Sequence, residues 1–333
     1  MLHPDRPALV LAPMEGITDA PMRDLQGATG AFTYGVSEFL RVVAHAIPGK
    51  VFIRDIPELS QGSKTTTGLP VQVQILGGDP EMMALSAINA VQAGATAIDI
   101  NFGCPAPTVN RHDGGATLLK YPDRIEAIVR AVRTAVPDSI PVSAKLRLGW
   151  EDIEDIFENA QRVVSGGASW LTIHARTRAQ GYKPPVFWKP IGVVRKSLPI
   201  PVIANGDIWT LDDFKRCRDE TGCIHYMIGR SVLSNPSLPY QIAQSLQISM
   251  RPEPDWNWVD LLRELVRYTD LHKGPTIARS PTRLKQWLKL AANFGDFKDF
   301  EAVKIARSAT ELLDCLENKS RATPRIATFA SVE

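Results

Sequence analysis

Short apolar runs alternate with longer helix-like stretches through the first two thirds of the chain. Most of the runs are continuously apolar, which is typical of strands buried on both faces of a parallel sheet. The eight runs are 8–13, 34–39, 71–77, 97–103, 142–149, 170–176, 201–207 and 225–230. Amphipathic segments lie between most of them, including 80–93, 124–136, 152–165 and 211–220. Eight strands with helical crossovers predict an α/β protein built as a (β/α)8 or TIM barrel.

A doubly wound open sheet is the structural alternative. It is the weaker interpretation, because the count of strands reaches eight and no G-x-G-x-x-G follows the first strand. The length of 333 residues suggests two domains, but a barrel occupies about 250 residues as one unit.

The pattern changes after about residue 245. Prolines and tryptophans punctuate 252–258, and the segments 258–271, 282–292 and 297–316 then have helical spacing. We therefore expect a barrel domain over 1–245 and an all-helical domain over 246–333. The tail from Ser320 to Glu333 is expected to be poorly ordered.

Composition excludes several classes of protein. The net charge of +2 is too mild to establish a polyanionic partner by itself. The four cysteines have no C-x-x-C spacing, which argues against a metal site and suits a reducing cytosol. The N-terminal residues lack the layout of a secretory signal, and no run of about 18 apolar residues exists. We expect a cytoplasmic, monomeric protein with no membrane span.

A thiol lies where the fourth predicted strand ends, in Asn101-Phe102-Gly103-Cys104-Pro105. A free cysteine is often packed simply as a small hydrophobe. The flanking Asn, Gly and Pro, and the loop at Gly114-Gly115, favour a thiol held at the mouth of the sheet. In a barrel the carboxyl ends of the strands form the active face.

Other strand ends are polar as well. Gly206 and Gly229-Arg230 follow the last two strands, where loops commonly bind phosphate through backbone N–H groups. Lys145 would suit an electron-rich ring or an oxyanion, or it pairs with a nearby acid such as Asp99. Gln74 and Asn205 offer amide groups to the edge of a heterocycle.

His174 has two interpretations of similar weight. It would donate to a cofactor or act in acid–base chemistry, or it is a buried histidine satisfied by backbone. Together the strand ends predict a site for a phosphorylated planar heterocycle beside a thiol. Flavin mononucleotide (FMN) fits that description.

Several of these segments resemble the tRNA-dihydrouridine synthases, most closely the bacterial C-type subfamily. The motifs run in order over about residues 8–240 and are specific in combination. They are Leu11-Ala12-Pro13-Met14-Glu15-Gly16, Val73-Gln74-Ile75-Leu76-Gly77, Asp99-Ile100-Asn101-Phe102-Gly103-Cys104-Pro105, Gly114-Gly115-Ala116-Thr117, Lys145-Leu146-Arg147-Leu148-Gly149-Trp150, His174-Ala175-Arg176-Thr177, Asn205-Gly206-Asp207-Ile208 and Met227-Ile228-Gly229-Arg230. One departure is Ser231, where the family usually has Gly.

The resemblance implies an FMN-binding barrel that reduces the 5,6 double bond of uridine in the D-loop of tRNA, at position 16, with NADPH or NADH as reductant. It makes Cys104 the proton donor to uracil C5, while the reduced flavin supplies hydride to C6. It assigns FMN contacts to Pro13, Met14, Glu15, Gln74, Lys145, His174, Asn205, Gly206, Asp207, Gly229 and Arg230. Asn101 would touch the uridine.

The surface facing tRNA is expected at the entrance of the barrel and on the helical domain. Arg41, Arg176 and Tyr182 follow strands on the active face. Residues 271–290 hold five cations and no acid, and Trp287 lies among them; Arg283, Lys285 and Trp287 are the predicted contacts. The alternative is a solvated helix face with Trp287 in the core.

Two rival functions stay open from the sequence. An FMN barrel acting on a free pyrimidine would share Lys145, Asn205 and the phosphate loops, but would not need the cations of the helical domain. An RNA-binding protein whose barrel no longer catalyses would not need the set of polar strand ends that includes Cys104 and His174.

Overall fold

The computed structural model describes residues 1–111 and 113–322. Contacts within the chain divide it into two units. The first comprises Met1–Val232 and Pro236–Glu253, and the second comprises Leu233–Asn235 and the chain from Pro254 onward. The boundary that we expected after residue 245 thus falls after Glu253. One reason is that Arg251 donates a hydrogen bond of 2.8 Å to the carbonyl of Ala28, within the first unit.

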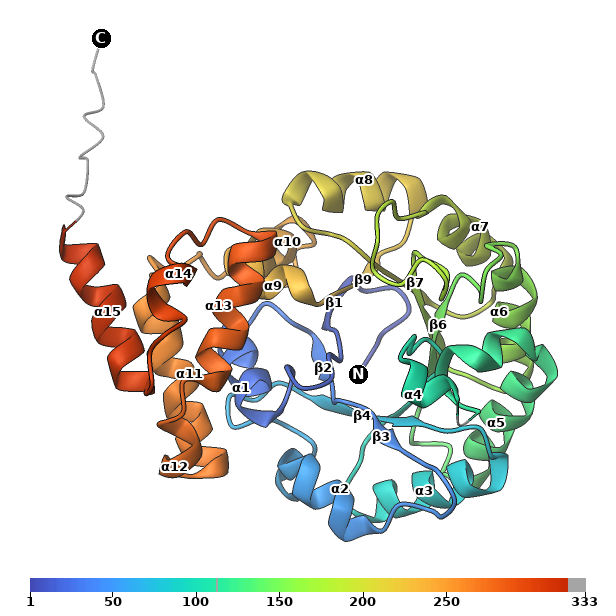
Figure 1. Ribbon diagram of the computed structural model, residues 1–333. Helices are drawn as coiled ribbons and strands as arrows, with labels where there is room; N and C mark the ends of the chain where they lie inside the picture. Colours follow the sequence, from blue (N-terminus) through green and yellow to red (C-terminus); the bar gives the residue numbers. More distant parts are fainter. Residues whose placement is uncertain (112, 323–333) are drawn as a thin grey trace. The chain divides into compact units, whose positions relative to one another are not determined.

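The first unit is built on a closed parallel barrel, as the sequence predicts (Figure 1). Each of the eight expected runs contains a strand: β1 (Ala8–Leu11), β2 (Tyr34–Val36), β4 (Val71–Leu76), β5 (Ile98–Asn101), β6 (Val142–Arg147), β7 (Trp170–His174), β8 (Val202–Asn205) and β9 (His225–Ile228). Neighbours in this order pair in parallel register, β9 pairs with β1, and β2 pairs with β4. A further two-residue strand, β3 (Leu40–Arg41), pairs with the end of β4.

The interior of the barrel is divided into an apolar half and a polar half. The apolar half is a cluster of buried side chains from β1, β2, β7, β8 and β9, against which Leu2 packs: Val10, Ala12, Tyr34, Val36, Trp170, Ile203 and Met227. The strands β4, β5 and β6 instead carry buried polar side chains at alternate positions: Gln72, Gln74, Asp99, Asn101 and Ser143. Because alternate residues of a barrel strand face the interior, both sets project inward.

Helices surround the barrel and connect its strands (Figure 1). They are α1 (Ala20–Ala28), α2 (Gly49–Asp55), α3 (Pro80–Gln92), α4 (Pro107–Asn110), α5 (Pro122–Ala135), α6 (Asp155–Ser165), α7 (Lys189–Ser197), α8 (Leu211–Thr221) and α10 (Leu238–Ser245), with 3-10 turns at Pro57–Gln61 and Gly115–Lys120. The short helix α9 (Arg230–Ser234) follows β9 directly. Helix α8 begins with a capping box, in which the side chains of Thr210 and Asp213 each accept a hydrogen bond from the backbone N–H of the other.

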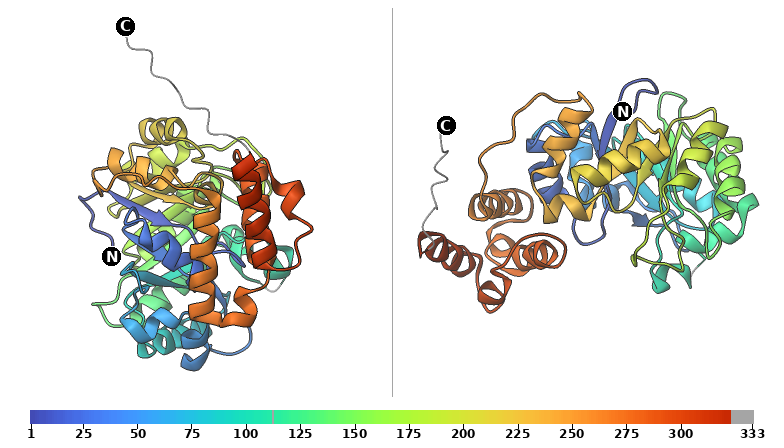
Figure 2. Two further views of the ribbon diagram at one scale, coloured as in Figure 1. Left: turned by 90° about the vertical axis from the view of Figure 1, so that its left-hand side faces the viewer. Right: turned by 90° about the horizontal axis from the view of Figure 1, so that it is seen from above.

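The described residues of the second unit form helices joined by loops, without a strand, and these helices are the dark orange and red coils of Figure 2. They are α11 (Trp258–Lys273), α12 (Pro275–Ala278), α13 (Thr282–Phe294), α14 (Phe300–Val303) and α15 (Ala309–Ala322). An aromatic cluster lies in its core, where the ring of Trp258 contacts those of Trp256, Trp287 and Phe297 with centroids 5.3–5.9 Å apart.

The prediction of one continuous helix over 297–316 is wrong. The helix ends at Val303 and restarts at Ala309, because Ser308 caps a new first turn. The N–H of Glu311 donates to Ser308 Oγ at 3.1 Å, and the carboxylate of Glu311 accepts from the N–H of Arg307 at 2.7 Å. Helix α15 then continues to Ala322, so Ser320–Ala322 are helical rather than part of a tail. The rest of the expected tail, 323–333, lies outside the described residues.

Across residues 1–111 and 113–322, none of the helices combines the length and the apolar character needed to span a bilayer.

Candidate active site

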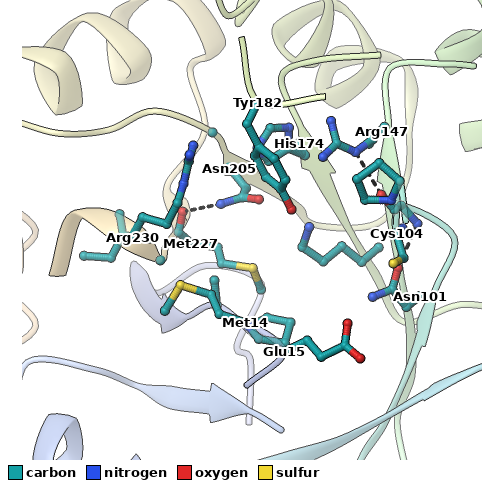
Figure 3. Close-up of a pocket in the computed structure, with 18 of the residues that line it drawn as sticks. Met14, Glu15, Asn101, Cys104, Arg147, His174, Tyr182, Asn205, Met227 and Arg230 are labelled. Atoms are coloured by element: carbon teal, nitrogen blue, oxygen red, sulfur yellow. Dashed lines mark hydrogen bonds between the residues drawn. The ribbon is translucent and has the colours of Figure 1, made fainter. Parts of the chain in front are cut away.

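A cavity of about 550 Å³ opens at the carboxyl ends of the strands. This is within the range of roughly 300–1,000 Å³ that is usual for small-molecule sites. Most of the site residues predicted from the sequence line it (Figure 3): Pro13, Met14, Glu15, Asn101, Cys104, Lys145, His174, Tyr182, Asn205, Gly206, Asp207, Gly229 and Arg230. Gln74 and Arg176 lie behind this wall.

Cys104 lies on the wall of the cavity, directly after β5. Its backbone N–H donates to Asn101 Oδ1 at 3.0 Å, and its carbonyl accepts from the N–H of Ala116 at 3.1 Å. The left-handed backbone of Gly115 allows this approach, because a Cβ there would meet the Cys104 carbonyl oxygen at 2.9 Å. Burial, with a contribution from the charge of Glu15, raises the pKa of the thiol. At neutral pH the sulfur therefore carries its proton.

Lys145 and His174 supply two different kinds of donor to the same cavity. Burial, then the charge of Arg147, lowers the pKa of Lys145 to about 8, so its ammonium is still mostly protonated at pH 7. Burial and four nearby cations lower the pKa of His174 well below its ordinary value, so its imidazole is neutral. Only 8% of His174 is exposed, and its Nδ1 has no hydrogen-bond partner among the described residues. A buried polar atom without a partner in a cavity wall is suited to a ligand.

The loops after β8 and β9 form the opposite end of the cavity. Gly206 adopts a φ of +121°, and a Cβ at this position would meet the backbone nitrogen of Ala175 at 3.2 Å. Asn205 donates from Nδ2 to the carbonyl of Met227 at 2.8 Å, which leaves its Oδ1 as an acceptor. Arg230 begins α9 and donates to Asp207 Oδ1 at 3.0 Å. Backbone N–H groups, a guanidinium and a helix start are together suited to a phosphate.

The side chain of Arg176 links the loop after β7 with the loop after β8. Its side chain is fully buried and donates from both terminal nitrogens to the two carboxylate oxygens of Asp207, one of them at 2.9 Å. Its Nε donates to the carbonyl of Lys183 at 2.7 Å. Burial alone would raise the pKa of the Asp207 carboxyl, but Arg176 and Arg230 hold it below its ordinary value.

Tyr182 lies at the mouth of the cavity and is 56% exposed. Its ring lies between the guanidinium groups of Arg147, 5.2 Å from the centroid, and Arg230, 4.7 Å from it. The edge of the ring meets His174, with centroids 6.3 Å apart. A partly exposed aromatic ring with two cations beside it is suited to contact an incoming nucleotide through its ring and its charges.

Three predicted contacts need correction. Arg176 is buried and paired, so it holds loops in place and does not face a substrate. Gln74 is fully buried and bonded to Asp99 and Asn101. Arg41 is partly exposed and donates to the carbonyl of Thr108 at 3.1 Å, outside the cavity lining, so its contact with tRNA stays a prediction.

The third correction concerns the helical unit. Trp287 is only 2% exposed, and its indole N–H donates to the carbonyl of Leu233 at 2.8 Å. It is a core residue and offers no face to a base. Arg283 and Lys285, on the same helix, are half-buried rather than fully exposed.

Arg147 was missed as a site residue. It lines the cavity, donates from Nε to the carbonyl of Gly103 at 2.8 Å, and bonds the carbonyls of Thr177 and Gly181 at 3.1 and 2.8 Å. It therefore ties the Cys104 loop to the Tyr182 loop. Its place two residues after Lys145 on one strand was the available signal, since both side chains must share a face.

The residues present fit a flavin. A planar ring system would find amide, ammonium and imidazole groups at Asn205, Lys145 and His174, and its phosphate would find the loops at Gly206 and Arg230. Among the described residues, no three His, Cys, Asp or Glu side chains gather where they could hold a metal ion.

The lowered pKa of Lys145 predicts how the stability of the protein depends on pH. Since the unfolded chain holds this proton up to about pH 10.5 and the folded chain releases it near pH 8, the free energy of unfolding should rise with pH across that window. Lys145→Met should remove this rise and stabilise the flavin-free protein at pH 7 by about 1–2 kcal/mol, because Lys145 is half-buried. Urea unfolding at pH 7 and pH 9.5 measures both effects. A Met variant that is less stable than the wild type at pH 7 would contradict this account of Lys145.

Together, the barrel and its cavity define the class of site found in flavin-dependent oxidoreductases, with a lining whose polar groups fit a flavin and a thiol on its wall. Residues 10–318 match the dihydrouridine synthase (Dus) family. A tRNA-dihydrouridine(16) synthase of Shewanella oneidensis is 44% identical over 312 residues, which cover 93% of this chain and 97% of that protein. A protein of the same name from Neisseria meningitidis is 40% identical over 320 residues, covering 93% and 95%.

The chain belongs to the dihydrouridine synthase family and is a tRNA-dihydrouridine synthase, an oxidoreductase whose family chemistry is the flavin-dependent reduction of uridine in tRNA. Among solved structures, a 2-naphthoyl-CoA reductase in complex with 2-naphthoyl-CoA aligns with a TM-score of 0.54 at 12% identity. The alignment covers 72% of this chain and 50% of that one, and it shows the shared barrel fold alone.

Proposed function

We propose that this enzyme binds FMN in the cavity, uses NADPH as reductant and converts uridine 16 in the D-loop of tRNA to 5,6-dihydrouridine, with Cys104 as the proton donor. The observation that carries the proposal is that the Cys104 thiol shares one cavity with Lys145, Asn205 and His174, whose Nδ1 has no hydrogen-bond partner among the described residues. The high identity to proteins named for position 16 supports the choice of target.

The chemistry requires an acid on the wall of the cavity. Asn205, Lys145 and the loops at Gly206 and Arg230 would hold FMN, which in its reduced form would supply hydride to uracil C6. Negative charge then develops at C5 and O4, and an acid must quench it. The raised pKa keeps the Cys104 thiol protonated, so its S–H can give the proton to C5 and later recover one from solvent. The ammonium of Lys145, one of several cations in the lining, can oppose charge on an oxygen.

The target nucleotide must leave its stack to reach the thiol. A uracil inside a folded tRNA cannot enter a cavity at the end of a barrel, so the nucleotide is extruded into it. Tyr182 and the guanidinium groups on either side of it lie at the mouth, where a flipped base would pass. Extrusion costs a few kcal/mol, and binding of the tRNA body must offset it.

The proposal is tested with purified enzyme, NADPH and tRNA transcripts that carry no modifications. Mass spectrometry of nuclease fragments should find two added hydrogens in the fragment with position 16, and a U16→C transcript should gain none. Added hydrogens at other D-loop positions with position 16 unchanged would contradict the target, and turnover with free uridine at the same efficiency would favour a pyrimidine reductase.

Exposed cations of the second unit should contribute to tRNA affinity. Arg279 and Lys289 are both exposed, and each would neutralise about one phosphate. The variant Arg279→Gln/Lys289→Gln should make the plot of log affinity against log salt shallower by about 1.4–1.8. A filter-binding titration at several salt concentrations measures this slope.

The matched control removes two cations from the end of the barrel that lies opposite the cavity. Arg6 precedes β1 and Lys196 lies near the end of α7, so both are at the amino-terminal ends of strands, and both are exposed. Arg6→Gln/Lys196→Gln should leave the slope unchanged. Equal slopes for the two double variants would refute a role of the helical unit in binding.

A further inference from the structure

A continuous chain of hydrogen bonds runs through the polar half of the barrel interior and ends at the Cys104 loop. It begins at Gln72, whose Nε2 donates to Ser143 Oγ at 2.9 Å, and Ser143 donates in turn to Asp99 Oδ1 at 2.5 Å. Asp99 is 2% exposed, and two donors point at its two oxygens, because Gln74 Nε2 lies 2.7 Å from Oδ2. Burial raises the pKa of the Asp99 carboxyl, while the hydrogen bonds from Ser143 and Gln74 and the charge of Lys145 oppose that rise and favour the ionised form. An ionised carboxylate can only accept hydrogen bonds.

Because this carboxylate only accepts hydrogen bonds, it fixes the orientation of two side-chain amides. Gln74 must present its NH₂ group to Asp99, which leaves its Oε1 facing Asn101. Asn101 must then present its own NH₂ group to Gln74, and its Nδ2 lies 2.9 Å from Gln74 Oε1. A carboxamide has one acceptor end and one donor end, so reversing either amide would bring like ends together.

The chain ends on the backbone of the thiol loop. Because Asn101 turns its Nδ2 towards Gln74, its Oδ1 faces the other way. That oxygen accepts from the N–H groups of Gly103 and Cys104 at 2.8 and 3.0 Å. If Asn101 were reversed, its NH₂ group would meet two backbone N–H donors, and both would lose their acceptor.

We propose that Asp99 is a positioning residue for the Cys104 thiol and acts through the enforced orientation of Gln74 and Asn101. Asp99 is not among the described residues that line the cavity, so it would act on the thiol through Gln74 and Asn101. The inference rests on the proposed function only for what the thiol does in catalysis. The position of the thiol itself can be measured without turnover.

A rival role for Asp99 is as a counter-charge for Lys145, which lies beside Asn101 across the β5–β6 pair. The two roles differ in their dependence on Gln74. A counter-charge acts whether or not Gln74 is present, whereas the hydrogen-bonded chain is broken once Gln74 loses its amide. Gln74→Met removes the amide and leaves the charge of Asp99 unchanged.

The first experiment measures how fast iodoacetamide alkylates Cys104 in the full-length protein, with flavin bound as purified. Peptide mass mapping reports each cysteine separately, and Cys315 of the second unit is the internal reference. Asp99→Asn and Gln74→Met should each speed alkylation of Cys104 by about fivefold, since a loosened loop exposes the thiol. The rate at Cys315 should not change.

The combination of the two substitutions separates the rival roles. In the Gln74→Met protein, adding Asp99→Asn should leave the alkylation rate of Cys104 unchanged. An equal further increase would assign Asp99 to Lys145, and an unchanged rate in both single variants would overturn the proposal. If Asp99→Asn does not fold, Gln74→Met decides alone, because a counter-charge role predicts a wild-type rate for it.

The second experiment reverses the direction of the chain. In Asp99→Asn/Asn101→Asp, the new carboxylate at 101 would accept from the loop and from a reversed Gln74. The reversed Gln74 would accept from the new amide at 99, which still accepts from Ser143. Every donor again has an acceptor, so the equilibrium constant for unfolding should return to within about threefold of the wild type.

Each single substitution should raise that constant by about tenfold or more, because each leaves like groups facing each other. A double variant as unstable as the sum of the singles would show that the amide orientations are not coupled, and would overturn the proposal. Neither experiment uses tRNA or turnover, so failure here is distinguishable from failure of the proposed function.

Discussion

Cys104→Ala should lose about 10²–10⁴-fold in the rate of dihydrouridine formation while its flavin content stays at the wild-type level. The expected loss is large because the thiol is the acid that must quench charge at uracil C5, and alanine has no proton to give. Flavin should remain because the groups suited to hold it, at Lys145, His174, Asn205 and Arg230, are untouched. Single-turnover kinetics on fully unmodified tRNA, with the flavin absorbance recorded beforehand, measure both quantities.

Cys315→Ala is the matched control for this variant. Cys315 is the other half-buried cysteine, and it lies on α15 of the second unit. Its removal should leave the rate within about twofold of the wild type. If Cys104→Ala proceeds at the normal rate, the proton comes from another group and the assignment of the acid fails.

Arg176→Met should have the largest effect on stability. The change leaves the half-buried carboxylate of Asp207 without its bidentate partner and frees the carbonyl of Lys183. Because Asp207 keeps Arg230 as a second partner, the loss should cost about 1.5–3 kcal/mol of the free energy of unfolding. Asp207 would also compete more strongly for Arg230, so the affinity for FMN should fall. Urea unfolding and flavin titration measure the two effects.

Arg178→Met provides a comparison two residues away in the same loop. The guanidinium of Arg178 lies 4.3 Å from the centroid of Trp150, and its buried Nε has no hydrogen-bond partner within the described part of the chain. Its removal should cost only about 0.5–1 kcal/mol. Equal losses for Arg176→Met and Arg178→Met would show that the ion pair with Asp207 does not anchor the loops.

The barrel could be predicted from the sequence because its strands are buried on both faces. A strand such as Val71–Leu76 is apolar or amide-bearing along its whole length, and eight such runs with helical crossovers have few alternative arrangements. The cavity could be predicted for the same reason, since the carboxyl ends of parallel strands meet at one face. The convergence of strand ends such as Asn205-Gly206 can therefore be predicted without knowing any distance.

Two kinds of feature could not be predicted from the sequence: contacts between residues of neighbouring strands, and the degree to which a given side chain is buried. The bond between Gln74 and Asp99 crosses from β4 to β5, and its register appears only in the folded sheet. Arg176 and Trp287 belong to types that often face nucleic acid, yet tertiary packing placed one in an ion pair and the other in an aromatic core. Local pattern alone does not distinguish these outcomes.

The central claim is that this chain reduces one D-loop uridine and needs the Cys104 thiol to do so. Its most direct test maps dihydrouridine, position by position, in tRNA from cells that lack the gene and carry either the wild-type chain or Cys104→Ala. We predict that dihydrouridine at position 16 is absent without the gene, returns with the wild-type chain and does not return with Cys104→Ala. Position 16 fully modified in the cells without the gene, or restored by Cys104→Ala, would contradict the account.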